Sequence, residues 1–172
     1  MRILILIFFL ILAIIGCFKI KTPVIYLIPY GYQGKILVIY GQERGRKEEF
    51  DGKRRLYRID TSGILITNFK SEDGILDEVY YYLKPDGSRE RINIDSSILE
   101  QDSVKAKKYL TKNYNTILVR YYGVSGGYGG APDFPKSVSY TESIIASGRF
   151  CDSTDLEKFE DRQWQIVVKK LK

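Results

Sequence analysis

The sequence predicts a mainly β, antiparallel sandwich-like domain with one or two helices, preceded by an N-terminal signal helix. Short β-type runs recur between glycine and proline turns from Val24 onward, without the longer helical stretches of alternating βαβ units. The 172-residue chain is 44% hydrophobic and 28% charged, which is the composition of a folded domain. An unbroken apolar run of 13 residues, Ile3–Ile15, precedes these strands. We therefore expect one β-rich domain over residues 23–172.

The apolar run near the N-terminus has the length of a signal-peptide core. A membrane-spanning helix needs about 20 apolar residues, whereas the core of a signal peptide needs about 7 to 15. Arg2 supplies a positive charge before the run, and Gly16-Cys17 follows it. The segment Ile14-Ile15-Gly16-Cys17 resembles the bacterial lipobox, in which a small residue precedes the cysteine that becomes acylated.

The lipobox resemblance implies a signal peptide over residues 1–16, lipidation of Cys17 and a lipidated tether over residues 17–22. The alternative is an uncleaved anchor helix with an unmodified Cys17. Acyl chains on Cys17 would anchor the protein in the membrane durably, because several chains bury far more methylene groups than one. Residue 18 is Phe and not the Asp associated with inner-membrane retention. In a cell with two membranes, this favours an exported lipoprotein of the outer membrane or periplasm.

The first strands are predicted from runs of β-branched and aromatic residues. Val24–Ile28 begins the domain directly after Pro23. Lys35–Tyr40 has apolar residues at consecutive positions, as expected of a central strand buried on both faces. Arg54–Ile59 alternates and is expected to be half-buried, and Gly63–Lys70 follows it.

A hairpin and a further pair of strands are expected next. Val79–Leu83 and Arg89–Ile94 flank a turn in which proline presets one dihedral angle and Gly87 accepts a positive φ. Thr116–Tyr122 and Val138–Ala146 have the composition of two more strands, joined by a long loop.

Two segments are predicted to be helical. The polar, lysine-rich stretch Asp102–Leu110 is expected to form a short helix. Thr154, followed three residues later by Glu157, is a capping-box signature that predicts a C-terminal helix. Acidic residues early in this segment and lysines near Lys172 suit the helix dipole.

The glycine-rich segment Gly123–Gly130 is the first place where we expect a binding surface. It lacks the Lys-Ser/Thr pair that a phosphate-binding loop requires, so nucleotide binding is not supported. We expect an interstrand loop over residues 123–135, and loops of this length are often functional. Four aromatic residues form the tentative binding set: Tyr121, Tyr122, Tyr128 and Phe134.

The composition excludes much of catalytic chemistry. The chain has no histidine, which removes the Ser-His-Asp and Cys-His arrangements and every His-ligated metal site. Carboxylates are scattered, and their spacing picks out no acid–base pair. We predict no catalytic residue, cofactor or metal site. Cys151, with Cys17 acylated, has no intramolecular disulfide partner and is expected to be a small buried hydrophobe.

A cationic stretch raises a second binding possibility. Seven Lys and Arg residues lie within the 15 positions from Arg44 to Arg58, accompanied by the acidic residues Glu43, Glu48, Glu49 and Asp51. Charges of both signs around the turns expected at Gly45 and Gly52 are typical of a solvated hairpin. The alternative is contact with anionic lipid headgroups or glycan phosphates. Nucleic acid is disfavoured as a partner because the protein is expected to be exported.

Several short motifs resemble a domain family of unknown function found on bacterial lipoproteins. They are Pro29-Tyr30-Gly31-Tyr32-x-Gly34, Gly41-Gln42, Gly52-x-x-Arg55-x-Tyr57-x-Ile59, Gly63-Ile64-Leu65-x-Thr67 and Tyr80-Tyr81-Tyr82. The resemblance covers roughly Val24 to Ile94, and Asp60 replaces a proline that is frequent in the family. The strand, turn-rich insert and following strand also faintly resemble the prealbumin-like sandwich of carboxypeptidase regulatory modules. Both resemblances imply an anchored β-domain without a known activity.

These observations predict a lipid-anchored cell-envelope protein whose β-rich domain binds a partner or has a structural role. The membrane, through Cys17, and an envelope protein or glycan are the expected partners. The competing hypothesis is a histidine-independent hydrolase acting on glycans or peptides. Two carboxylates facing each other in a deep pocket would favour the hydrolase. An inhibitor or immunity-type protein, with a contiguous patch near residues 123–135, is a third possibility.

Overall fold

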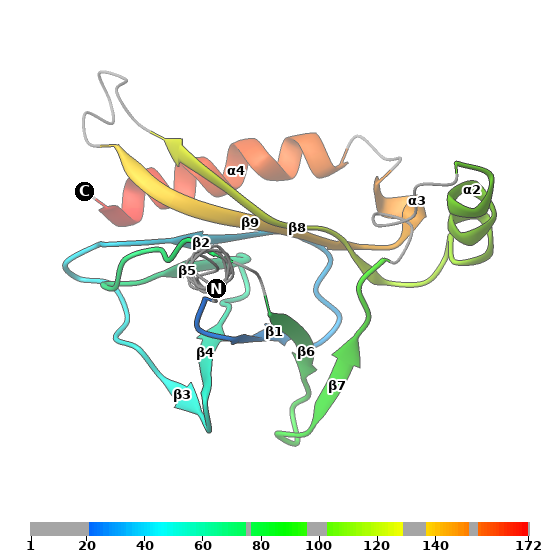
Figure 1. Cartoon of the computed structure of the whole chain (residues 1–172). Helices are drawn as coiled ribbons and strands as arrows, with labels where there is room; N and C mark the ends of the chain where they lie inside the picture. Colours follow the sequence, from blue (N-terminus) through cyan, green and yellow to red (C-terminus); the bar gives the residue numbers. More distant parts are fainter. Residues whose placement is uncertain (1–20, 75–76, 96–102, 129–136, 152–154, 172) are drawn as a thin grey trace, which may run out of the picture.

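The computed structural model describes residues 21–74, 77–95, 103–128, 137–151 and 155–171 (Figure 1). The predicted signal peptide, Cys17, Phe134 and the Thr154 cap lie outside these residues. The described elements, in chain order, are β1 (Val24–Pro29), β2 (Gly34–Ile39), β3 (Phe50–Asp51), β4 (Arg54–Arg58), β5 (Ile64–Ile66), β6 (Glu78–Leu83), β7 (Arg89–Ile92), α2 (Ser103–Lys112), β8 (Leu118–Tyr128), β9 (Val138–Ala146), α3 (Gly148–Cys151) and α4 (Asp155–Leu171).

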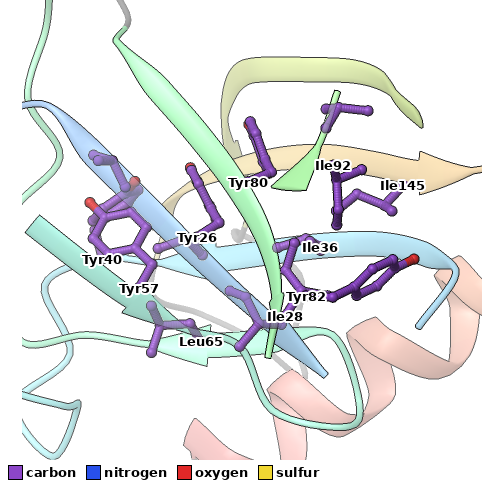
Figure 2. Packing of buried hydrophobic residues seen from close by; sticks show 14 residues of the cluster. Tyr26, Ile28, Ile36, Tyr40, Tyr57, Leu65, Tyr80, Tyr82, Ile92 and Ile145 are labelled. Atoms are coloured by element: carbon purple, nitrogen blue, oxygen red, sulfur yellow. The ribbon is translucent and has the colours of Figure 1, made fainter. Parts of the chain in front are cut away.

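Two sheets and helix α4 form three layers. One sheet has the strand order β3-β4-β1-β6-β7 and the other β5-β2-β9-β8, and α4 covers the outer face of the second sheet (Figure 1). The main core lies between the sheets, as Figure 2 shows for Tyr26, Ile28 and Tyr80 of one sheet and Ile36 and Ile145 of the other. The predicted sandwich-like, mainly β architecture is therefore confirmed.

Side-chain alternation along β2 explains how one strand serves two cores. Ile36 and Val38 point into the space between the sheets, whereas Leu37 and Ile39 pack with Val167 of α4. Successive residues of a strand point to opposite faces, so a strand that is apolar throughout must be covered on both. All six residues of β2 are buried, and β2 lies between β5 and β9, which confirms the predicted central strand.

The prediction of antiparallel pairing is wrong in part, because both sheets are mixed. β1 pairs in parallel with β4 and with β6, and β2 pairs in parallel with β5. The pairs β3–β4, β6–β7, β2–β9 and β8–β9 are antiparallel. After β1 the chain crosses to the other sheet to form β2 before it returns as β4, and such crossover connections bring strands back in the same direction.

Several individual elements follow the prediction. β6 and β7 form the expected hairpin, in which Gly87 has a φ of 83°. Helix α2 confirms the short lysine-rich helix, and α4 confirms the C-terminal helix. Among the described residues, no helix is long and apolar enough to cross a membrane.

The prediction of a loop beginning at Gly123 is wrong for residues 123–128, which continue strand β8. Gly126 pairs with Tyr140 of β9, and a Cβ atom on Gly126 would lie 2.6 Å from the Tyr140 hydroxyl. Glycine is therefore required by the close approach of the tyrosine ring, a recognised role of glycine within strands. The register of the β8–β9 pair shifts twice between Val119 and Val124, and Gly123 has a φ of 68° in this irregular region.

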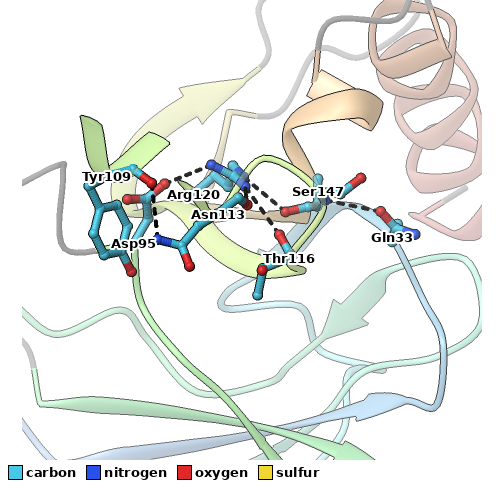
Figure 3. A network of polar contacts seen from close by, with 8 residues as sticks. Gln33, Asp95, Tyr109, Asn113, Thr116, Arg120 and Ser147 are labelled. Atoms are coloured by element: carbon cyan, nitrogen blue, oxygen red, sulfur yellow. Dashed lines mark hydrogen bonds and ion pairs between the residues drawn. The ribbon is translucent and has the colours of Figure 1, made fainter. Parts of the chain in front are cut away.

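A buried arginine attaches the α2 region to the four-stranded sheet (Figure 3). Arg120 forms an ion pair of 2.9 Å with Asp95, and both side chains are at least nine-tenths buried. The same guanidinium donates to the carbonyl oxygens of Ala146, Asn113 and Thr116. Because four hydrogen bonds tie the buried guanidinium to several parts of the chain, we assign Arg120 a structural role.

Candidate functional site

A groove at one end of the four-stranded sheet is the candidate functional site. It has a volume of about 660 Å³ and lies where β2 ends, β9 begins and α4 ends. In Figure 1 the C-terminal end of α4 and the loop after β2 are at the same, left-hand end of the molecule. The lining residues are Gly41, Gln42, Glu43, Arg44, Ile66, Ser137, Val138, Lys170 and Leu171.

The wall formed by Gly41–Arg46 is held in place by backbone hydrogen bonds to the β5 region. The amide of Gln42 donates to the carbonyl of Thr67, and the amide of Arg46 donates to that of Ile66, each at 2.8 Å. Gly45 lies against the backbone of Thr67, where a Cβ atom would collide. The glycine thus permits the close approach that directs Glu43 and Arg44 to the surface.

The polar character of the groove comes from mixed charges and hydrogen-bonding groups. Arg44 is exposed on one wall, and Lys170 contacts Asp60 at 2.7 Å on the other. Partial burial favours the protonated form of Asp60, but hydrogen bonds from Lys170, Ser62 and the Ile64 amide outweigh it and lower the pKa. Asp60 therefore stays ionised and holds Lys170 at the rim.

The structure places the predicted aromatic set only partly near this groove. The backbone of Tyr128 pairs with Val138, which lines the groove, whereas Tyr121 pairs with Ile144 farther along the hairpin, beside Tyr122. Phe134 lies outside the described residues. Sequence reasoning missed Gln42, Ser137 and Lys170 as members of one site, although the Gly41-Gln42 motif and the cationic stretch from Arg44 were signals for one wall.

A second polar cluster lies between the sheets, around the half-buried Glu78. The hydroxyl of Tyr80 donates to Glu78 at 2.6 Å, and that of Tyr26 does so at 3.3 Å. Burial raises the pKa of Glu78, and these two hydrogen bonds act in the opposite direction. The adjoining pocket has a volume of only about 20 Å³, enough for one water molecule.

Thr22, near the first residue that the structure describes, is bound at the outer wall of that small pocket. The amide of Thr22 donates to Glu72 at 2.9 Å, and its hydroxyl does so at 3.1 Å. Arg55 contacts the same carboxylate at 2.6 Å, Glu48 at 2.8 Å, and lies over the ring of Phe69. The Thr22 amide, together with Arg55, lowers the pKa of Glu72 to about 2. An ionised Glu72 thus fixes the point at which the chain enters the domain.

These arrangements bear on what chemistry the site can perform. The residues lining the groove include one carboxylate, Glu43, whereas glycoside hydrolysis needs two facing each other. Within the described ranges no cluster of three or more Cys, Asp or Glu is placed to hold a metal ion. The groove presents amide, hydroxyl and basic groups, which are suited to binding a polar or anionic ligand.

The fold occurs in a solved structure of a "Putative Lipoprotein from Bacillus anthracis", with a TM-score of 0.56 and 17% sequence identity over 87% of this chain and 95% of that chain. At this identity the likeness shows a shared fold. No curated protein matches the chain. A family model described as "Family of unknown function (DUF6843)" matches residues 20–125, in agreement with the resemblance drawn from the motifs between Val24 and Ile94. The chain belongs to this family of unknown function, DUF6843.

Proposed function

We propose that this protein is a lipid-anchored cell-envelope protein whose β-rich domain acts as a binding module, with the groove as its ligand site. The observation that carries the proposal is the groove itself. Its volume of about 660 Å³ falls within the range of roughly 300 to 1,000 Å³ typical of ligand sites. Its walls present Gln42, Arg44 and Ser137, which can recognise polar or anionic groups.

The anchor is supported by the sequence and by the fold. Gly16-Cys17 follows an apolar run of signal-peptide length, and the Bacillus anthracis protein of similar fold carries a lipoprotein description. An exported lipoprotein of this kind would lie in the outer membrane or periplasm of a cell with two membranes. A fatty-acid probe should label the wild-type protein but not Cys17→Ala. Equal labelling of both would refute the anchor.

Ligand binding is testable by capture from envelope extracts with the full-length, detergent-solubilised protein. An envelope protein or glycan should be retained by the wild type and lost with Gln42→Ala combined with Arg44→Ala. A matched pair on α2, Lys107→Ala with Lys108→Ala, should retain it, because these exposed residues lie away from the groove. Equal capture by all three proteins would exclude the groove as the site.

A hydrolase acting on glycans or peptides is less well supported. Glu78 has the raised pKa of a general acid, but Tyr26 and Tyr80 hold its carboxylate between the sheets. The pocket beside it, at about 20 Å³, cannot admit a sugar ring or a peptide. This half-buried, hydrogen-bonded carboxylate thus favours a structural role over a catalytic one.

A further inference from the structure

Basic side chains gather at the end of the domain that contains the groove. Five of them are exposed and a sixth, Lys21, is half-buried. None of the six forms a salt bridge within the part of the chain that the structure describes. The six residues are Lys21, Arg44, Arg46, Lys47, Lys70 and Lys169, and we call them the basic end.

Hydrogen bonds and shared pockets bring the segments that carry these residues to the same end of the domain. Arg44 lines the groove with Lys170, the neighbour of Lys169. The amide of Gly41 donates to the carbonyl of Phe69, which brings the loop after β2 next to Lys70. Lys21 lines the small pocket with Tyr40 and Ser71, which are the sequence neighbours of Gly41 and Lys70.

Three acidic residues at this end contact two basic residues outside the set of six. Glu48 and Glu72 contact Arg55, and Asp60 contacts Lys170. Glu43 and Asp73, which are exposed, and Glu78, which interacts electrostatically with Lys21, add further negative charge at this end. The basic end therefore carries an excess of positive charge toward the solvent.

The tether brings this surface to the membrane. Thr22 is fixed to the domain by its two hydrogen bonds to Glu72. Five residue steps separate Thr22 from Cys17, and an extended chain covers at most about 18 Å over that length. An acyl anchor on Cys17 consequently holds the edge of the domain near Lys21 within about 18 Å of the lipid headgroups.

We propose that the basic end docks on the anionic phospholipid headgroups of the membrane that carries the anchor, so that the groove opens at the membrane surface. This inference rests on the lipid anchor of the proposed function. Charge complementarity and the short tether both favour a lipid surface as the partner. Basic residues are attracted to an anionic leaflet over about a Debye length, roughly 10 Å at 0.1 M salt, and the tether keeps them close to it.

The test compares hydrogen exchange of the full acylated protein on phosphatidylglycerol vesicles and on phosphatidylcholine vesicles. Amides of residues 41–47 and 165–171 should exchange at least about threefold more slowly on the anionic vesicles. The difference should disappear in about 1 M salt, where the Debye length falls to about 3 Å. Equal exchange on both vesicles, or slowing confined to α2, would overturn the docking surface.

Charge reversal supplies the matched control. The triple variant Arg44→Glu, Lys47→Glu and Lys169→Glu should lose the slowing, whereas Lys107→Glu, Lys108→Glu and Lys112→Glu on α2 should keep it. All six positions are exposed, and unchanged circular dichroism would confirm that both variants fold. Failure of the anchor would appear separately, because the protein would no longer co-float with phosphatidylcholine vesicles. The slower hydrogen exchange on phosphatidylglycerol vesicles would still test whether the basic end docks.

Discussion

Gly63 shows how a single residue determines the contact between α4 and the four-stranded sheet. It has a φ of 78°, and a Cβ atom there would collide with the Tyr32 hydroxyl and lie 2.6 Å from the Gln163 side-chain nitrogen. The position needs glycine for its backbone angle and also for space. These two requirements can be separated by mutation, because Gly52 has a φ of 62° and open space around it.

We predict that Gly63→Ala destabilises the domain far more than Gly52→Ala. The alanine at position 52 has only the conformational cost of a left-handed backbone, about 1 to 2 kcal/mol. The alanine at position 63 must also displace Tyr32 and Gln163, which brings the expected loss to about 3 kcal/mol or more. Urea denaturation of both variants measures the difference. Equal losses would show that the contact with Gln163 is not tight.

Glu78 is predicted to make stability depend on pH. Burial raises its pKa above the ordinary 4.5, so the folded state binds its proton more tightly than the unfolded state does. Stability from this group is complete below about pH 4.5 and is lost as the pH rises through the raised pKa. Glu78→Gln, which can still bond the hydroxyls of Tyr26 and Tyr80, should remove this loss.

The measurement for Glu78 is the free energy of unfolding of both proteins at pH 5 and pH 8. The variant should gain stability relative to the wild type as the pH rises. Glu72 does not confuse the comparison, because its pKa of about 2 places its own effect in acid, where stability falls as the pH drops below 4.5. A constant difference between the two proteins would contradict the assignment.

At the scale of elements, a buried polar side chain within an apolar contact helps to attach α4 to the sheet. Gln163 is 1% exposed, and its amide nitrogen donates to the carbonyls of Lys35 at 2.7 Å and Ser62 at 2.9 Å. Val167, one helical turn later, is fully buried against Leu37 and Ile39. The hydrogen bonds thus fix the position of a helix whose apolar face alone would permit sliding.

We predict that Gln163→Ala lowers the free energy of unfolding by about 1 to 3 kcal/mol, because the carbonyl of Ser62 loses its donor, whereas that of Lys35 keeps the hydroxyl of Tyr32. Gln165→Ala, at an exposed position of the same helix, should change it by less than about 0.5 kcal/mol. Thermal unfolding followed by circular dichroism compares the two. A small effect at position 163 would mean that water replaces the side-chain amide.

Local chemistry made most elements predictable. The β6–β7 hairpin follows from Pro85 and Gly87, whose dihedral preferences act within the turn itself. The glycine-rich part of β8 could not be predicted in this way. Its strand conformation depends on Tyr140 of β9, which packs over Gly126, and this partner comes from another segment of the chain.

The whole molecule is determined by pairings that sequence patterns do not reveal. Alternation predicts that β1, β4 and β6 are strands, but their parallel order depends on the crossover to the second sheet. The ion pair of 2.6 Å between Asp51 of β3 and Arg89 of β7 joins the two edges of the five-stranded sheet. Edges four strands apart would be about 19 Å from each other in a flat sheet, so this sheet is strongly curled.

The candidate site was predictable only in its parts for the same reason. The cationic stretch from Arg44 and the C-terminal lysines are visible in the sequence, but their meeting around one groove requires β2, β9 and α4 to end together. With the proposed lipid anchor, the distance between that groove and the membrane is likewise a property of the whole molecule. It depends on the tether and on the hydrogen bonds that hold Thr22.

Tether length gives the corresponding prediction. Inserting about 15 glycine and serine residues between Lys19 and Ile20 lengthens the link from Cys17 to Thr22 fourfold, to a root-mean-square span of about 25 Å. Effective concentration falls roughly as the −3/2 power of linker length, which is about eightfold here. The slowing of exchange at residues 41–47 on phosphatidylglycerol vesicles should weaken accordingly, while co-flotation persists because the acyl anchor is unchanged. The same insertion in the exposed turn between Asp86 and Gly87 is the control and should leave the slower exchange unchanged. If exchange is slowed equally with the long tether, proximity to the membrane does not promote docking.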